Sequence, residues 1–237
     1  MKKMLEVGKM TAEMFGKIEG YMCSCMGDSA HDKEHIYRVL YNALEIAKGE
    51  EAVNYDVLIA ACLLHDIGRQ EQFRNPSLCH AQVGAEKARK FLAEQGFSVE
   101  FGEKVYHCIQ THRFRKANQP QTIEAKILFD ADKLDVTGAI GIARSLMYKA
   151  DVAEPLYTRR PDGSISDGTE EDSPSFFREY KFKLEKLYDK FYTKKGKALA
   201  SVRQEIAQSF CESLYREVNE GYTEGSRLLS GLINTPV

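Results

Sequence analysis

Apolar residues recur every three or four positions along most of this chain, the spacing that places side chains on one face of an α-helix. The first such run extends from Val7 to Met22, and the second covers 36–47 and stops before Gly49. Because glycine commonly follows the last residue of a helix, we expect two amphipathic helices here. No segment alternates apolar and polar residues clearly enough to predict a strand.

The third run is apolar on every side and therefore predicts a helix buried at the centre of a bundle. It reads YDVLIAACLLHDIG over 55–68 and ends on His65 and Asp66, with Gly68 as the expected C-terminal stop. Residues 69–78 are polar and contain a proline, so we expect them to form a loop.

Further helices are expected over 80–96, 99–114, 123–134 and 139–150. The segment 151–174 is rich in proline, glycine, serine and acidic residues without an apolar period, which indicates a surface loop or a lid. Apolar spacing returns over 177–191 and 199–218 and predicts two C-terminal helices. We therefore expect an all-α fold that forms a single domain over 1–237, with its core at 20–150, the loop or lid at 151–174 and a helical extension at 175–237.

The composition is that of an ordinary globular chain and excludes several classes of protein. The 237 residues include 33 basic and 35 acidic side chains, so a net charge of −2 provides no polycationic surface for a nucleic acid. No stretch approaches the roughly 20 apolar residues that cross a bilayer, and the N-terminal segment lacks the apolar core of a signal peptide. We expect a cytoplasmic protein that binds neither nucleic acid nor membrane. The six cysteines contain no CxxC pair and are expected to be inert thiols.

Metal-binding side chains occur where the apolar pattern predicts the core. All six histidines precede Thr122. His65 and Asp66 end the most apolar helix. His35 lies in the second predicted helix, and Asp132 follows an apolar stretch. A buried carboxylate must be paired, protonated or bound to a cation. A mixed nitrogen and oxygen ligand set suits Mn, Fe, Co, Ni or Zn and leaves positions open for water or substrate.

Three motifs make the chain similar to a known family: HDKEHIYRV at 31–39, AACLLHDIG at 60–68 and DADKLD at 130–135. Over about 31–149 the sequence resembles the HD superfamily of metal-dependent phosphohydrolases, and within it the small bacterial and archaeal HD-domain hydrolases. The resemblance implies a helical bundle of the HD-domain type in which the metal ligands are His35, His65, Asp66 and Asp132. Asp132 is chosen over Asp130 and Asp135 because the family's aspartate follows an alanine.

The order of the histidines leaves a second cation open. Some HD enzymes hold two metals with the help of two further histidines, and His80 and His112 lie at the corresponding places between the HD pair and the last aspartate. The alternative role for both is substrate binding in the pocket. His31 and His107 are not expected to be ligands. The implied cofactor is a divalent metal ion, one or two per site, of Mn, Mg, Ni, Co, Fe or Zn.

Basic side chains close to these ligands in the sequence fit an anionic substrate, because charge accumulates on phosphate oxygens during phosphoryl transfer. The candidates for substrate binding are Arg38, Arg69, His80, His112, Arg113 and Arg115, with Lys116 beside them. Catalytic roles are predicted for Asp66, for Lys133 next to a metal ligand, and for Asp135, since residues at that offset orient substrate or water in related enzymes.

The leading hypothesis is hydrolysis of a phosphate ester or anhydride in a nucleotide, with metal-activated water as the nucleophile. The sequence contains no GxSxG motif and no Walker-type loop, which agrees with a water nucleophile. Two alternatives stay open: an HD-fold di-iron oxygenase that uses four histidines and two aspartates, and a nucleotide-binding regulatory module. The substrate, the bond cleaved and homo-oligomerisation through the C-terminal helices are undecided.

Overall fold

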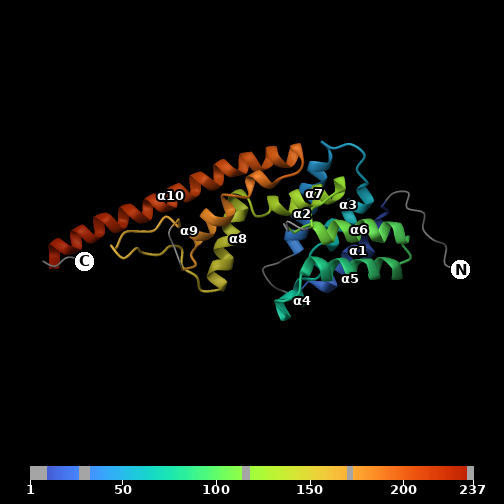
Figure 1. The fold of residues 1–237 in the computed structure, drawn as a ribbon, viewed down its shortest axis with the longest axis horizontal. Coiled ribbons are helices and arrows are strands. Elements are labelled where there is room, and N and C mark those ends of the chain that lie inside the picture. Colours follow the sequence, from blue (N-terminus) through green and yellow to red (C-terminus); the bar gives the residue numbers. More distant parts are fainter. Residues whose placement is uncertain (1–9, 27–32, 114–117, 170–172, 234–237) are drawn as a thin grey trace. The chain divides into compact units, whose positions relative to one another are not determined.

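The computed structural model describes residues 10–26, 33–113, 118–169 and 173–233. Within these ranges the chain is built from helices, and the β-type pairing consists of one isolated bridge between Arg159 and Ile165 (Figure 1). The prediction of an all-α fold is therefore confirmed. No helix in the described part of the chain is both long and apolar enough to cross a membrane.

The chain divides into two compact units, which are described separately. Unit 1 comprises Met1–Asp135 and Phe191–Gly196, and unit 2 comprises Val136–Lys190 and Lys197–Val237. The single-domain organisation stays a prediction.

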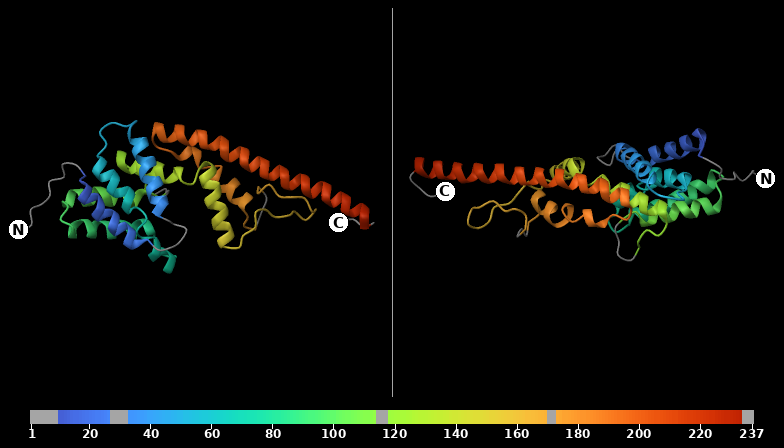
Figure 2. Two further views of the ribbon diagram at one scale, coloured as in Figure 1. Left: turned by 180° about the vertical axis from the view of Figure 1, so that it is seen from behind. Right: turned by 90° about the horizontal axis from the view of Figure 1, so that it is seen from above.

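Unit 1 is a helical bundle in which one helix, α3 (Tyr55–Leu64), lies at the centre. It contains α1 (Ala12–Cys25), α2 (Lys33–Ala47), α3 (Tyr55–Leu64), α4 (Arg69–Arg74), α5 (His80–Glu94), α6 (Val99–Thr111), α7 (Ile123–Leu134) and the first residues of α10 (Lys194–Ile233). The helix α3 packs against α1, α2, α5, α6 and α7, and α5 and α6 lie side by side (Figures 1 and 2). Seven of its ten residues are buried, which confirms that an all-apolar run marks the centre of the bundle.

Local signals set where these helices begin and end. The side chains of Thr11, Asn54, Ser98 and Thr122 each accept a hydrogen bond from a backbone N–H in the first turn of the helix that follows, which satisfies one of the otherwise unpaired donors there. Gly96 follows α5 with a φ of 84°, the left-handed conformation that glycine adopts readily.

The turn after α3 differs from the prediction in a way that shapes the site. Residues 69–78 do not form a continuous loop, because Arg69–Arg74 form α4, and Gly68 is its N-cap rather than the stop of α3. The φ of Gly68 is −95°, so a left-handed turn does not explain the glycine. A Cβ there would lie 2.3 Å from the backbone oxygen of His80 and 2.6 Å from the backbone nitrogen of Gly84. Only glycine allows this turn to pack directly on the backbone of α5.

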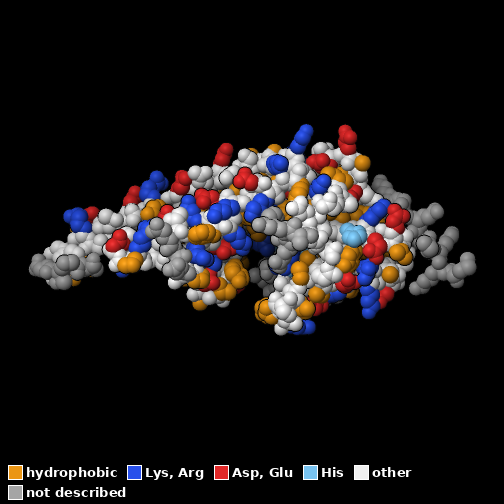
Figure 3. Space-filling model, viewed as in Figure 1, with side chains coloured by type: hydrophobic (Ala, Val, Ile, Leu, Met, Phe, Trp, Pro, Cys, Tyr) orange, Lys and Arg blue, Asp and Glu red, His pale blue; other side chains and the backbone are white. Residues whose placement is uncertain are grey.

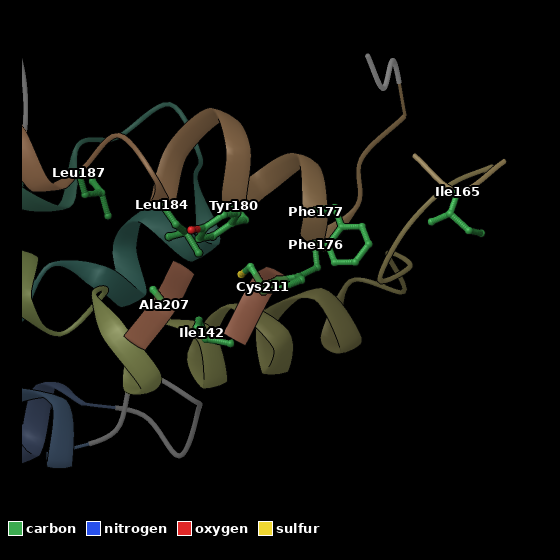
Figure 4. Close-up of a cluster of buried hydrophobic side chains, with 9 residues drawn as sticks. All are labelled: Ile142, Ile165, Phe176, Phe177, Tyr180, Leu184, Leu187, Ala207 and Cys211. Atoms are coloured by element: carbon green, nitrogen blue, oxygen red, sulfur yellow. The ribbon is translucent and has the colours of Figure 1, made fainter. Parts of the chain in front are cut away.

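Unit 2 has its own hydrophobic core. It contains α8 (Gly138–Asp151), α9 (Phe176–Glu179), a π-helical turn (Tyr180–Leu184), a 3₁₀ turn (Tyr188–Lys190) and most of α10. Its buried cluster consists of Ile142, Ile165, Phe176, Phe177, Tyr180, Leu184, Leu187, Ala207 and Cys211 (Figure 4). Ile165 comes from the segment predicted as a loop or lid and is 1% exposed, so this part of the segment is packed as core. Closure of the segment over a pocket stays a prediction.

The two predicted C-terminal helices are only partly correct. The first, 177–191, is broken into α9, the π-helical turn and the 3₁₀ turn. The π-helical turn changes the register between Tyr180 and Leu184, and both side chains remain buried. The second helix is longer than predicted, because α10 continues through Gly221 to Ile233. This part of α10 contains Gly221, Gly225 and Gly231. Each glycine costs a helix only about 1 kcal/mol relative to alanine, and the helix accommodates all three.

Candidate metal centre

The four side chains predicted to bind a metal lie together in unit 1. His35 comes from α2, His65 and Asp66 from the turn after α3, and Asp132 from the last turn of α7. The Nε2 atom of His35 is 3.5 Å from Oδ2 of Asp66 and 3.5 Å from Oδ1 of Asp132. The Nε2 atoms of His35 and His65 are 3.3 Å apart. His35, His65 and Asp132 thus form one group of potential ligands, with one donor atom each within 4.8 Å of the others.

His80 and His112 join the same centre from the first turn of α5 and the end of α6. Their Nε2 atoms are 3.3 Å apart and lie 3.4 Å and 3.6 Å, respectively, from Oδ1 of Asp66. Asp66, His80 and His112 therefore form a second group of potential ligands. All four histidines are at most 2% exposed, and Figure 3 shows little histidine surface on the face that it presents.

Asp66 connects the two groups. Its Oδ2 atom faces His35 and His65 at 3.5 Å and 3.7 Å, whereas Oδ1 faces the second group. Asp66 is fully buried, and Oδ1 has no hydrogen-bond partner among the described residues. A buried carboxylate oxygen without a donor is costly, and a cation held between Asp66, His80 and His112 would remove this cost. The residues present therefore fit a metal ion.

The second nitrogen of each histidine is already engaged. Nδ1 donates to a backbone oxygen in His65 and His112, with distances of 2.8 Å and 2.6 Å to Cys62 and Ile109. Because a carbonyl oxygen only accepts, these two rings carry their proton on Nδ1 in the neutral form and direct the lone pair of Nε2 into the centre. The Nε2 atom of His112 lies 3.3 Å from that of His80. Two neutral rings whose lone pairs face each other in this way cannot satisfy each other, whereas a cation between them can.

The other two histidines are held by side chains. His35 Nδ1 is 2.7 Å from Oδ2 of Asp135, and Asp135 in turn accepts hydrogen bonds from Arg38 at 2.6 Å and 3.1 Å. His80 Nδ1 lies 2.5 Å from Oε1 of Gln72 in α4. Such partners fix the tautomer and the ring orientation of metal-binding histidines.

Burial and neighbouring charges set the protonation states of the centre. Burial lowers the pKa of His65 to about 4 and that of His80 to about 2. For Asp66, burial acts to raise the pKa, but His65 and Arg69 hold it well below its ordinary value. For His35, burial acts to lower the pKa, but its hydrogen bonds to Asp135 and Asp66 raise it to about 9. At neutral pH the centre therefore presents ionised carboxylates and neutral rings at His65 and His80, the forms that bind metals, whereas His35 is protonated and must release a proton when a cation binds.

The remaining predicted residues are placed at different distances from the centre. Arg69 Nε donates to Oδ2 of Asp66 at 2.9 Å. Arg113 donates to Cys79 Sγ, the residue before His80. Lys133 lies over the ring of Phe129, with its ammonium 4.8 Å from the centroid. His107 is exposed on α6. Arg115, Lys116 and His31 fall outside the described residues.

Asp130, which competes with Asp132 for the ligand role in the sequence, has a structural contact instead. Its carboxylate accepts hydrogen bonds from the backbone of Tyr192 and Thr193 and from the Thr193 hydroxyl, at the start of α10. Gln72 is the residue of the centre that sequence reasoning missed. It lies in the segment predicted as a loop, where no helical register could place it near His80.

Comparison with known proteins agrees with this geometry. Residues 33–137, which contain all six side chains of the centre, match the family model of the HD domain. Similar structures include an HD-superfamily hydrolase from Bacillus thuringiensis, 29% identical, covering 87% of this chain and 97% of that one, with a TM-score of 0.67. Residues 33–137 therefore form an HD domain, and the chain is similar in structure to HD-superfamily hydrolases.

Two further comparisons involve one relative. The uncharacterized protein YpgQ of Bacillus subtilis strain 168 is 29% identical over 194 residues, which are 80% of this chain and 85% of that protein. The structure of Bacillus subtilis YpgQ in complex with ADP is similar with a TM-score of 0.66 and 26% identity, covering 86% of this chain and 97% of that chain.

Proposed function

We propose that this chain is a metal-dependent phosphohydrolase that cleaves a phosphate ester or anhydride of a nucleotide. The observation that carries the proposal is the buried Asp66, whose two oxygens face two separate groups of potential ligands. One cation would be held by His35, His65, Asp66 and Asp132, and a second by Asp66, His80 and His112. A bound divalent cation lowers the pKa of its water from about 15.7 to about 7 and so supplies hydroxide at neutral pH.

The donor set narrows the choice of metal. Four imidazoles and two carboxylates favour Mn, Fe, Co, Ni or Zn. Mg²⁺ prefers oxygen ligands, so it is the weakest candidate of the six ions considered from the sequence.

The side chains at the centre have defined tasks in this proposal. Asp135 and Arg38 orient His35, so that its Nε2 faces Asp66 and Asp132. Arg69 is about a third exposed while it donates to Asp66, and it offers the rest of its guanidinium to phosphate oxygens. The ADP bound in the structure of YpgQ supports a nucleotide as the substrate class.

The test is a hydrolysis panel with metal-stripped protein. Mn, Co, Ni, Zn or Mg is added back, and release of orthophosphate and of pyrophosphate is measured separately for nucleoside mono-, di- and triphosphates and cyclic nucleotides. His65→Ala should abolish turnover, whereas the exposed His107→Ala should keep it. Absence of both products with every metal and every nucleotide would refute the proposal.

The same six side chains support a second candidate, an HD-fold di-iron oxygenase, because they comprise four histidines and two aspartates. That protein would contain two irons per chain and consume oxygen with an organic substrate. Elemental analysis and an oxygen-electrode trace distinguish the candidates. A nucleotide-binding regulatory module is less well supported, because a non-catalytic protein has no need of a complete ligand set.

A further inference from the structure

The two groups of the centre are held by very different partners. In the first group, His35 is bound by the carboxylate of Asp135, which is 1% exposed and is itself bound by Arg38. In the second group, the corresponding partner of His80 is the neutral side-chain amide of Gln72. A carboxylate partner raises the basicity of a metal-binding imidazole, and its negative charge attracts a cation. A neutral amide raises the basicity much less and adds no charge.

The helices that supply these partners also differ in how firmly they are anchored. Asp135 directly follows α7, which buries seven of its residues in unit 1. Gln72 lies on α4, which has six residues and buries none of them. The side-chain bonds of α4 include Arg69 to Asp66, Gln72 to His80, and Glu71 to Lys87 of α5. The position of α4 therefore depends in part on the metal centre that it supports.

The side-chain amide of Gln72 can present either its oxygen or its N–H group to His80. With Oε1 toward His80, as here, Nδ1 carries the proton and the Nε2 lone pair points at Asp66 and His112. With the amide turned over, its N–H would donate to Nδ1, and the proton would move to Nε2, where it blocks a cation. The carboxylate of Asp135 can only accept, so His35 has no equivalent alternative.

From these differences we infer that the centre binds one cation tightly, at His35, His65 and Asp132, and a second more weakly, at His80 and His112, with Gln72 as the positioning residue that sets the second affinity. Asp66 serves both. This inference rests on the two-cation form of the proposed function.

The experiment is a titration of metal-stripped full-length protein with Mn²⁺ by isothermal calorimetry. The wild type should bind two ions with clearly different affinities. Gln72→Leu should lower the affinity for the second ion by about 10- to 100-fold, the usual effect of removing such a partner. It should leave the affinity for the first ion unchanged. Gln72→Glu, which supplies a carboxylate, should raise the affinity for the second ion. Asp135→Asn should weaken binding of the first ion and leave the affinity for the second ion unchanged.

Gln82→Leu is the matched control, because Gln82 lies two residues from His80 on α5 but bonds to Glu86 and Tyr106. It should leave both affinities unchanged. Low-temperature electron paramagnetic resonance gives an independent readout, since two Mn²⁺ ions sharing Asp66 couple their spins. The coupled signal should require more Mn²⁺ in Gln72→Leu than in the wild type.

The possible outcomes separate this inference from the proposed function. If the wild type binds two ions and Gln72→Leu changes neither, or weakens both equally, the role of Gln72 is refuted while the two-cation centre stands. If the wild type binds one ion at saturating Mn²⁺, the inference is refuted and a one-cation hydrolase remains. If no ion binds, the proposed function fails as well.

Discussion

Replacing Asp66 with alanine removes the one carboxylate that faces both groups of ligands. The expected result is loss of metal binding and of turnover together, because both oxygens of Asp66 lie within 3.4–3.7 Å of imidazole Nε2 atoms. The folded protein should survive the change, because Oδ1 has no hydrogen-bond partner to lose among the described residues, and Arg69, which loses its acceptor Oδ2, is about a third exposed and can be solvated by water.

The size of the effect follows from linkage between binding and folding. At a metal concentration of 100 times Kd, a ligand that binds only the folded state stabilises it by about 2.7 kcal/mol. Unit 1 spans about 140 residues, which at about 2.1 cal/mol/K per residue corresponds to an unfolding entropy of about 0.3 kcal/mol/K. Mn²⁺ should therefore raise the Tm of the wild-type unit by about 9 °C and should not raise that of Asp66→Ala.

The assay combines calorimetry with and without Mn²⁺, elemental analysis and phosphate release. Asp56→Ala is the matched control, because Asp56 lies in the first turn of α3, the helix that ends just before Asp66, but accepts a hydrogen bond from the backbone of Met10. It should retain the Mn²⁺-dependent rise in Tm. Hydrolysis by an Asp66→Ala protein that contains no metal would refute the mechanism.

Three further predictions concern stability. The lowered pKa values of His65 and His80, about 4 and about 2, mean that the unfolded chain binds protons below pH 6.5 that the folded chain does not. Acidification from pH 6.5 to 5 should therefore lower the free energy of unfolding of the metal-free protein, by up to about 1.4 kcal/mol per pH unit for each of these two histidines, as measured by urea unfolding. His35, whose pKa is raised to about 9, is already protonated in the folded protein and offsets part of this loss near pH 6.5. Gly68→Ala should lower the free energy of unfolding by at least about 1–3 kcal/mol and weaken Mn²⁺ binding, because its Cβ would meet the backbone of α5. Its control is Gly102→Ala, where the nearest atom lies 4.0 Å from the added Cβ, and this variant should be more stable by up to about 1 kcal/mol. Asp130→Ala should cost at least about 2 kcal/mol in the same unfolding assay, since it leaves the buried donors at the start of α10 without their charged acceptor.

Each of these predictions has a contrary outcome. Stability that is flat between pH 6.5 and 5 would mean that the two histidines protonate in the folded protein. A Gly68→Ala variant as stable as the wild type would show that the turn after α3 can move away from α5. An Asp130→Ala variant of wild-type stability would mean that water satisfies the start of α10.

Much of the helical architecture could be predicted because it depends on local spacing. The all-apolar run at 55–68 predicts a central helix, and α3 is central. Two errors of the prediction arise where the pattern carries no period. The helix α4 buries none of its residues, so it leaves no apolar stripe in the sequence. The C-terminal pattern weakens after Gly221, yet α10 continues, because an exposed helix does not need an apolar face to persist as part of a longer one.

The sequence by itself determined most of the helices of unit 1, the order of the potential ligands and the resemblance to HD proteins. Those properties depend on residue type and on spacing along the chain. Only the tertiary structure decided that Asp66 faces two groups at once, that His80 and His112 share its second oxygen, and that Gln72 orients His80. These relations join α4, α5, α6 and the turn after α3, and the close packing that Gly68 permits is what brings them together. Distances across a bundle depend on how helices pack, and no periodicity within one helix contains that information.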